Sequence, residues 1–323
     1  MKAKDTAQQW TAAINEVTIG AKSSEGGTRG KTVTIGGAKT IPWLGYEGPV
    51  GRRPTIAVEV RDAGAEAWPE ELRKQYGSVL KDPAAWARRA IELGADLVCL
   101  RLSGTHPDMG NRSADEAAAT VKAVLKAVEV PLIIWGCGVE DKDNTVLPKC
   151  SEAVKGENCL LGSITQKNYR TLVAAALADG HKLIAESPLD INIAKQTNIL
   201  AHDVGFPLEN LVIFPTTAAL GYGFEYVYSI MERSRLAGLG GDRLLMQPVL
   251  CDVGTEAWRA KEATAGEESL PGFGPAPERG VLWETLTATN YLQAGADLLI
   301  MRHPQAVAAV RKAIDRLCAP AKG

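Results

Sequence analysis

The chain has 323 residues, a net charge of only −2 and basic residues scattered along its length. This length suits an α/β barrel with extensions, and the charge pattern lacks the basic face that is typical of nucleic-acid-binding proteins. No run of about 18 apolar residues occurs, and the first residues lack the apolar core of a signal peptide, so we expect a cytoplasmic protein without nucleic-acid or membrane partners.

Residues 1–53 are predicted to be an N-terminal extension built around a β-hairpin. Residues 17–20 and 33–36 both read Val-Thr-Ile-Gly, and a polar, glycine-rich link joins them. Two short runs of this kind around such a link are typical of antiparallel strands. We expect the hairpin to plug the bottom of a barrel, and an arm that reaches a partner subunit is the alternative.

Residues 54–323 are predicted to form a (β/α)8 TIM barrel. Helix patterns alternate with strand-length apolar runs, and Val121, Val124, Leu125 and Val128 illustrate one such helical face. Strands that are apolar on successive residues are typical of parallel sheets. An open doubly wound sheet is disfavoured because no GxGxxG follows the first strand. The eight predicted strands are residues 55–60, 96–102, 131–135, 158–163, 182–186, 211–214, 244–250 and 297–301.

Residues 254–280 are predicted to be a long irregular insertion, because prolines and glycines cluster there after the seventh strand. An insertion at this place lies on the ligand side of a barrel. The six cysteines are spread widely, without the close spacing of metal or cluster-binding motifs, so we expect no iron–sulfur cluster on this chain.

The residues at the carboxyl ends of the predicted strands indicate binding rather than hydrolysis. In barrels these positions carry the function. They are rich in uncharged hydrogen-bonding groups and poor in paired acids and grouped metal ligands. The positions are Asp62, Arg101, Ser103, Thr105, His106, Cys137, Ser163, Gln166, Glu186, Ser187, Thr216, Thr217, Asp252, Arg302 and His303.

Four of the candidates have a structural alternative. Glu186 is the best candidate for proton chemistry, and a salt bridge or a helix cap is its alternative. His303 either faces the ring or bonds the start of the last helix. Tyr222 and Tyr226, four residues apart, either pack on a planar ligand or face the core. The loop at 214–226, with Thr216, Thr217 and Gly221, is suited to holding a bulky ligand.

Six segments resemble the small subunit of the corrinoid/iron–sulfur protein of anaerobic acetyl-CoA synthesis, the delta-type subunit of acetyl-CoA decarbonylase/synthase. The likeness extends over essentially the whole chain. The segments are 187–196 (SPLDINIAKQ), 220–226 (LGYGFEY), 229–233 (SIMER), 253–262 (VGTEAWRAKE), 278–284 (ERGVLWE) and 301–304 (MRHP).

The resemblance implies a methyl carrier rather than an enzyme in its own right. It implies a heterodimer in which a large subunit carries a 4Fe–4S cluster and the two subunits enclose a cobamide, a cobalt corrinoid. A separate methyltransferase supplies the methyl group from methyltetrahydrofolate, and CO dehydrogenase/acetyl-CoA synthase receives it in Wood–Ljungdahl carbon dioxide fixation. We expect no catalytic or metal-ligating residue on this chain. The cofactor-facing residues expected are Glu186, Ser187, Asn192, Thr216, Thr217, Gly221, Tyr222 and His303.

Two alternatives stay open. One is a stand-alone pterin-dependent methyltransferase, although the related enzymes hold pterin with Asp and Asn at strand ends and that full set is missing here. The other is a structural subunit whose barrel never touches the cofactor. Phe214 precedes Pro215 at the end of the sixth predicted strand, whereas the family that this chain resembles often has an acidic residue before this proline.

Overall fold

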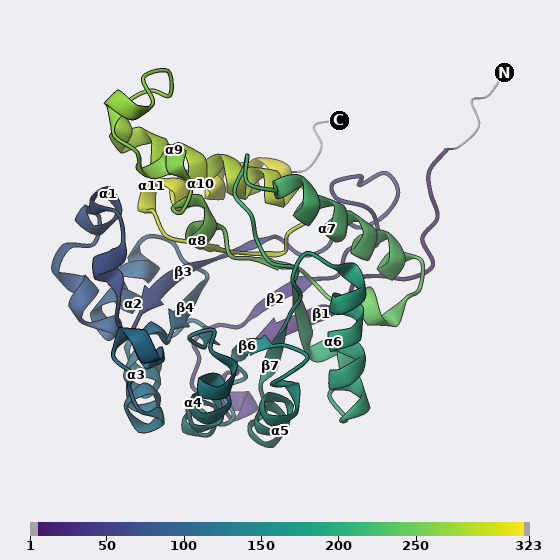
Figure 1. The fold of residues 1–323 in the computed structure, drawn as a ribbon. Coiled ribbons are helices and arrows are strands. Elements are labelled where there is room, and N and C mark those ends of the chain that lie inside the picture. The colour runs from purple at the N-terminus through teal and green to yellow at the C-terminus, as the bar shows by residue number, and fades with distance from the viewer. Residues whose placement is uncertain (1–5, 320–323) are drawn as a thin grey trace.

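The computed structural model describes residues 6–319, which form a parallel β-barrel surrounded by helices (Figure 1). The eight strands follow one another in the order β8-β7-β6-β5-β4-β3-β10-β9. The ring closes where Ile213 pairs with Val249 and its N–H bonds the Pro248 carbonyl at 2.9 Å. The predicted TIM barrel is therefore confirmed. Its strands are β3 (Thr55–Arg61), β4 (Leu97–Arg101), β5 (Leu132–Trp135), β6 (Leu160–Ile164), β7 (Lys182–Glu186), β8 (Leu211–Phe214), β9 (Leu250–Cys251) and β10 (Leu298–Met301).

The seventh barrel strand is much shorter than the predicted 244–250. A 3-10 turn (Arg243–Leu245) begins that segment, and Asp242 caps it by accepting a hydrogen bond from the Leu244 N–H. Pro248 lacks an N–H to donate to a sheet. Only the two residues of β9 therefore pair as a strand.

Helices cover the outside of the ring with the apolar faces that their sequences predict. In α3 (Ala114–Ala127), Val121, Val124 and Leu125 are buried, and Ser113 caps the helix together with Glu116. The other long helices are α2 (Pro83–Glu92), α4 (Glu140–Ala153), α5 (Tyr169–Asp179), α6 (Ile191–Asp203), α7 (Phe224–Leu239), α10 (Ala276–Gln293) and α11 (Pro304–Leu317). Three short helices are α1 (Glu70–Lys74), α8 (Val253–Ala257) and α9 (Lys261–Thr264). In the described part of the chain no helix is long and apolar enough to cross a bilayer.

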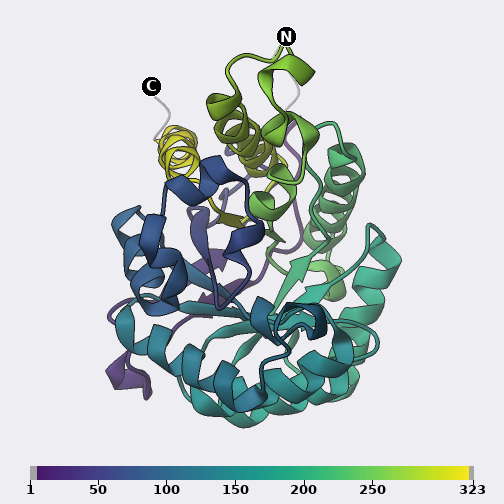
Figure 2. The same ribbon diagram turned by 60° about the vertical axis from the view of Figure 1, so that its left-hand side comes forward.

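The insertion is more regular than predicted. Between residues 254 and 280 the chain forms most of α8, all of α9 and the first residues of α10. In Figure 2 this green segment stands at the top of the molecule. The segment follows β9, so it lies at the carboxyl end of the barrel strands, as expected.

The barrel has one core inside the ring and another between the ring and the helices. Side chains alternate along each strand, so Ile56 and Val58 point outward to the helices while Ala57 points inward. The inner core contains Ala57, Leu97, Cys99, Ile133, Leu160, Ile184, Val212, Leu250, Leu298 and Ile300, with residues of the hairpin.

The N-terminal hairpin fills the amino-terminal end of the barrel. Strands β1 (Glu16–Ile19) and β2 (Val33–Gly36) pair antiparallel (Figure 1). The Thr18 and Thr34 hydroxyls bond at 2.8 Å. Val17, Ile19, Val33 and Ile35 belong to the inner core, next to the first residues of the barrel strands. The hairpin is therefore a plug, as predicted.

Replacing Ile35 with alanine tests the plug. Ile35 is fully buried in the inner core, so we expect the unfolding free energy to fall by about 2–5 kcal/mol. The matched control is Leu177→Ala on α5, where the side chain is 46% exposed and the change should stay within about 0.5 kcal/mol. Urea denaturation measures both values. Equal losses would contradict the structural role of the hairpin.

Candidate ligand site at the barrel mouth

A ring of charged and aromatic side chains closes the carboxyl-terminal end of the inner core. Each of these residues lies two positions beyond an inward-facing residue of its strand, so it also faces inward. Below this ring the inner core is apolar, except for Glu59 on β3. We call the ring the mouth layer, and it consists of Arg61, Arg101, Trp135, Glu186, Phe214, Asp252 and Arg302.

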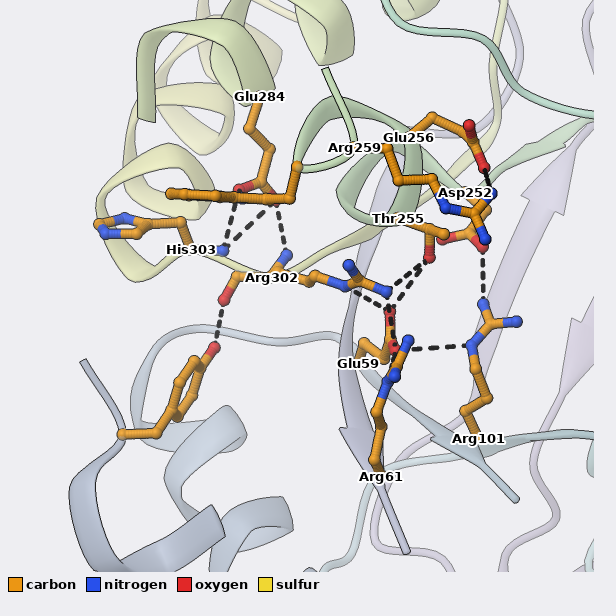
Figure 3. Close-up of polar contacts among 12 residues, drawn as sticks. Glu59, Arg61, Arg101, Asp252, Thr255, Glu256, Arg259, Glu284, Arg302 and His303 are labelled. Carbon is orange, nitrogen blue, oxygen red and sulfur yellow. Dashed lines mark hydrogen bonds and ion pairs between the residues drawn. The ribbon is translucent and has the colours of Figure 1, made fainter. Parts of the chain in front are cut away.

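Glu59 is fully buried beneath the mouth layer and is the anion that its arginines share (Figure 3). Its carboxylate accepts from Arg302 Nε at 2.8 Å and Nη2 at 3.1 Å, and from Arg61 Nε at 2.6 Å. Arg101 Nε lies 3.5 Å away. Burial alone would raise the pKa of Glu59, but the three guanidinium charges hold it well below the usual glutamate range.

Each arginine has a second support besides Glu59. Arg101 Nη2 donates to Asp252 Oδ2 at 2.6 Å, and its guanidinium lies 4.8 Å from the centre of the Trp135 ring. The guanidinium groups of Arg302 and Arg61 lie 4.8 and 5.4 Å from the centre of the Trp68 ring. Carboxylates and aromatic faces both stabilise guanidinium groups, so the side chains are held in fixed positions.

Glu284 on α10 ties the insertion to the end of β10. It is fully buried and accepts from Trp258 Nε1 at 2.7 Å, from the Arg302 N–H at 2.6 Å and from the His303 N–H at 3.0 Å (Figure 3). Burial raises the pKa of Glu284 to about 7, although the three N–H donors oppose this rise. The Tyr76 hydroxyl bonds the Arg302 carbonyl, which anchors the same segment from the other side.

His303 occupies a structural position at the start of the last helix. Its Nδ1 accepts from the Gln305 N–H at 3.2 Å, and its ring stacks on Trp258 with the centres 5.7 Å apart. Burial lowers the pKa of His303 to about 4, so the imidazole is neutral near pH 7. This position corresponds to the helix-start alternative of the sequence analysis.

Four predicted site residues come together on two neighbouring loops at the mouth. Glu186 accepts from the Ser163 hydroxyl, and burial raises its pKa. Thr216 Oγ1 donates to the Ser187 carbonyl at 2.7 Å. Thr217 Oγ1 accepts from the Asp252 N–H, just after β9, at 2.7 Å. Thr216 also has a φ of 66°, a strained value for a β-branched residue. Ser187 and Thr217 are buried, so Glu186 and Thr216 are the more accessible pair.

The other predicted residues lie farther out. Asn192 is exposed on the first turn of α6, and Gly221 is exposed in the loop before α7. Tyr222 is 50% exposed, and its hydroxyl bonds Glu262 at 2.8 Å and the Lys261 N–H at 3.0 Å, which links this loop to the insertion. Tyr226 is 64% exposed, so the core position considered for the two tyrosines is wrong.

Glu59, Arg61 and Trp135 were not among the site residues predicted from the sequence. A detectable signal was present, because Glu59 interrupts an otherwise apolar strand and Arg61 follows on the same face. A charge inside a buried strand requires a partner, and that requirement points toward the arginines on other strands. Within the described residues, no group of three or more His, Cys, Asp or Glu side chains is arranged to hold a metal ion.

The fold places the chain among the TIM barrels that also include dihydropteroate synthases. The enzyme from Xanthomonas albilineans, solved with 7,8-dihydropteroate, has a TM-score of 0.57 and 15% identity over 83% of this chain and 95% of that one. The Thermus thermophilus enzyme has a TM-score of 0.51 and 17% identity, covering 82% and 93%. At such identities the likeness shows the fold alone.

The chain belongs to the family of CO dehydrogenase/acetyl-CoA synthase delta subunits, whose sequence model matches residues 16–313. It is 38% identical to the acetyl-CoA decarbonylase/synthase complex subunit delta of Archaeoglobus fulgidus, over 96% of this chain and 70% of that one. The delta 1 subunit of Methanosarcina thermophila is 37% identical, covering 96% and 72%. The Methanopyrus kandleri subunit is 38% identical, covering 94% and 74%. The family predicted from the six segments is confirmed.

Replacing Glu59 with glutamine should destabilise the protein strongly. The change leaves three arginines without their shared anion, and breaking a buried ion pair costs about 3–5 kcal/mol. Glu256→Gln is the control, because Glu256 pairs with the exposed Arg259 and such pairs contribute about 0–1 kcal/mol. Chemical denaturation measures both variants. A loss from Glu59→Gln that is no larger than the control would contradict the assigned role.

Glu284 should make stability depend on pH. The Glu284 carboxyl has a pKa of about 7 in the folded protein, while the usual glutamate value is 4.5. The unfolding free energy should therefore fall as the pH rises from about 4.5 to 7, because the unfolded chain releases the proton first. Thermal melts across this range should show a shallower fall for Glu284→Gln, and the exposed Glu268→Gln should match the unmodified protein. Parallel curves for all three proteins would refute the prediction.

Proposed function

We propose that this chain is the small subunit of a corrinoid methyl carrier in the acetyl-CoA decarbonylase/synthase system. Its barrel mouth would cover a cobamide shared with a large subunit that carries a 4Fe–4S cluster. The carrying observation is the membership in the delta-subunit family, with 38% identity over 96% of the chain. The proposed wider partners are a methyltetrahydrofolate:corrinoid methyltransferase and CO dehydrogenase/acetyl-CoA synthase.

Exposed apolar side chains around the mouth support a large occupant. Met109, Leu189, Tyr222 and Phe273 are 39–50% exposed, and they lie in four different loops that follow barrel strands. All four loops lie on the face of the barrel that carries the strand ends, and exposed apolar side chains on such a face favour an interaction surface. A cobamide together with a second subunit would cover such a face.

The polar groups of the mouth also fit a cobamide, which is a broad macrocycle with an uncharged amide-bearing rim. Thr216 and Glu186 are partly accessible, and the side chains of Arg61 and Arg101 are 14% and 16% exposed. These side chains offer both hydrogen-bond donors and acceptors. The fit therefore rests on the mixture of donors and acceptors at the strand ends.

When bound, the cobamide would supply the cobalt that accepts and releases the methyl group. The residues of this chain would bind and orient the cofactor and exclude water from it. Arg61 and Arg101 are already held by Glu59, so they need no rearrangement to present their free N–H groups. This chain would cover one side of the cofactor and would not transfer the methyl group by itself.

The proposal is tested by the visible spectrum of the chain alone and paired with its large subunit, each after incubation with a cobamide and gel filtration. Corrin absorption retained by the pair is the expected result. A colourless pair would contradict the proposal. Binding of methyltetrahydrofolate to the isolated chain would instead favour the pterin-dependent methyltransferase, and retention of corrin by the large subunit alone would favour a scaffold.

A further inference from the structure

Two arginines of the mouth layer have hydrogen-bond donors that no described residue uses. Arg61 bonds only through Nε, and Arg101 Nη1 is likewise free. Both Nε atoms approach the same oxygen, Glu59 Oε1, at 2.6 and 3.5 Å, so the two guanidinium groups lie next to each other (Figure 3). Their side chains are 14% and 16% exposed, whereas Arg302 is 5% exposed.

Two carboxylates of the same layer have oxygens without a partner. Asp252 Oδ2 bonds Arg101, but Asp252 Oδ1 is buried and has no hydrogen-bond partner in the described chain. Glu186 uses Oε2 for the Ser163 hydroxyl, and none of the described residues bonds its Oε1. Arg101 and Glu186 are close enough for the arginine charge to oppose the rise in the pKa of Glu186. A buried acceptor without a donor costs free energy that a ligand N–H can recover.

The charges of the site are evenly matched. Arg61, Arg101 and Arg302 stand against three carboxylates, which are Glu59, Glu186 and Asp252. An anionic ligand would gain from the arginines but would be repelled by Glu186 and Asp252. A neutral group that carries an acceptor beside a donor can instead bond both kinds of side chain.

We propose that the mouth layer recognises primary carboxamide groups on the rim of its ligand. The amide oxygen accepts from the free N–H groups of Arg61 and Arg101, and the amide N–H donates to Glu186 Oε1, with Asp252 Oδ1 as the second acceptor. The ligand class is therefore a neutral molecule with carboxamide groups on its rim. This assignment rests on the proposed function, since a cobamide carries carboxamides around its corrin ring.

Two corrins that differ in the rim groups test the assignment. The chain paired with its large subunit is dialysed to equilibrium against cobinamide, which keeps its carboxamides, and against cobyrinic acid, in which carboxylates replace them. We expect the amide form to bind at least tenfold more tightly. This comparison uses the unmodified protein, so no variant has to fold for it to be informative.

Variants then locate the interaction. Arg101→Gln and Glu186→Ala should each weaken cobinamide binding about tenfold. Each variant should also lose the preference for cobinamide over cobyrinic acid. The control is Arg259→Gln, since Arg259 is an exposed arginine after β9 that pairs with Glu256 outside the mouth layer. Its affinity should stay within twofold of the unmodified pair. Thermal melts verify that each variant is folded.

The possible failures are distinguishable. Equal or tighter binding of the carboxylated corrin, or normal binding by both mouth variants, overturns the carboxamide assignment while the cobamide function stands. Binding of neither corrin overturns both. A fourth outcome is that the pair binds methyltetrahydrofolate and neither corrin, and that Arg101→Gln weakens this binding. The groups of the mouth layer would then bind a pterin, which overturns both the carboxamide assignment and the cobamide function.

Discussion

The structure depends on one buried carboxylate and the arginines that surround it. The pleat of β3 directs Glu59 into the barrel, where an isolated charge would be very costly. Arg302, Arg61 and Arg101 remove that cost together, and they lie at the carboxyl ends of three adjacent strands, β10, β3 and β4. Such an arrangement is strongly destabilised if one member is lost, so it constrains the whole set. The ion cluster therefore holds the strand ends together and positions the groups that face a ligand.

The two ends of the barrel interior differ in polarity. At the amino-terminal end the hairpin contributes four apolar side chains and closes the inner core. At the carboxyl-terminal end the interior changes to charged and aromatic residues, and Glu284 fixes the insertion against Arg302. A rigid, polar mouth is thereby placed among loops with exposed apolar side chains. This combination is suited to holding a large ligand beneath a second protein, because its polar groups are already oriented before binding.

Sequence reasoning succeeded where a local pattern has a direct physical cause. Strands, outer helices and the hairpin follow from the spacing of apolar residues, and so does the place of Glu186 at the end of β7. The ligand role expected of Glu186 and Thr216 stays a prediction. Prediction from the sequence failed where the outcome depends on distant partners. The shortening of β9 follows from the cap at Asp242 and from Pro248, while the exposed position of Tyr222 reflects its bond to Glu262 in the insertion. These effects require knowledge of which segments meet.

The sequence by itself determined the barrel, its hairpin, the order of its elements and the family, because periodicity and long matching segments are properties of the chain alone. That the hairpin plugs the barrel was decided by its packing in the inner core. Only the tertiary structure decided which charges meet. Glu59 and Arg302 are 243 residues apart in the sequence, yet the pairing of β10 with β3 brings them together as a bonded pair. The same tertiary arrangement buries His303 beneath the insertion and leaves donors free on Arg61 and Arg101. Hydrogen bonds act over a few ångströms of space, and no pattern along the chain encodes that proximity.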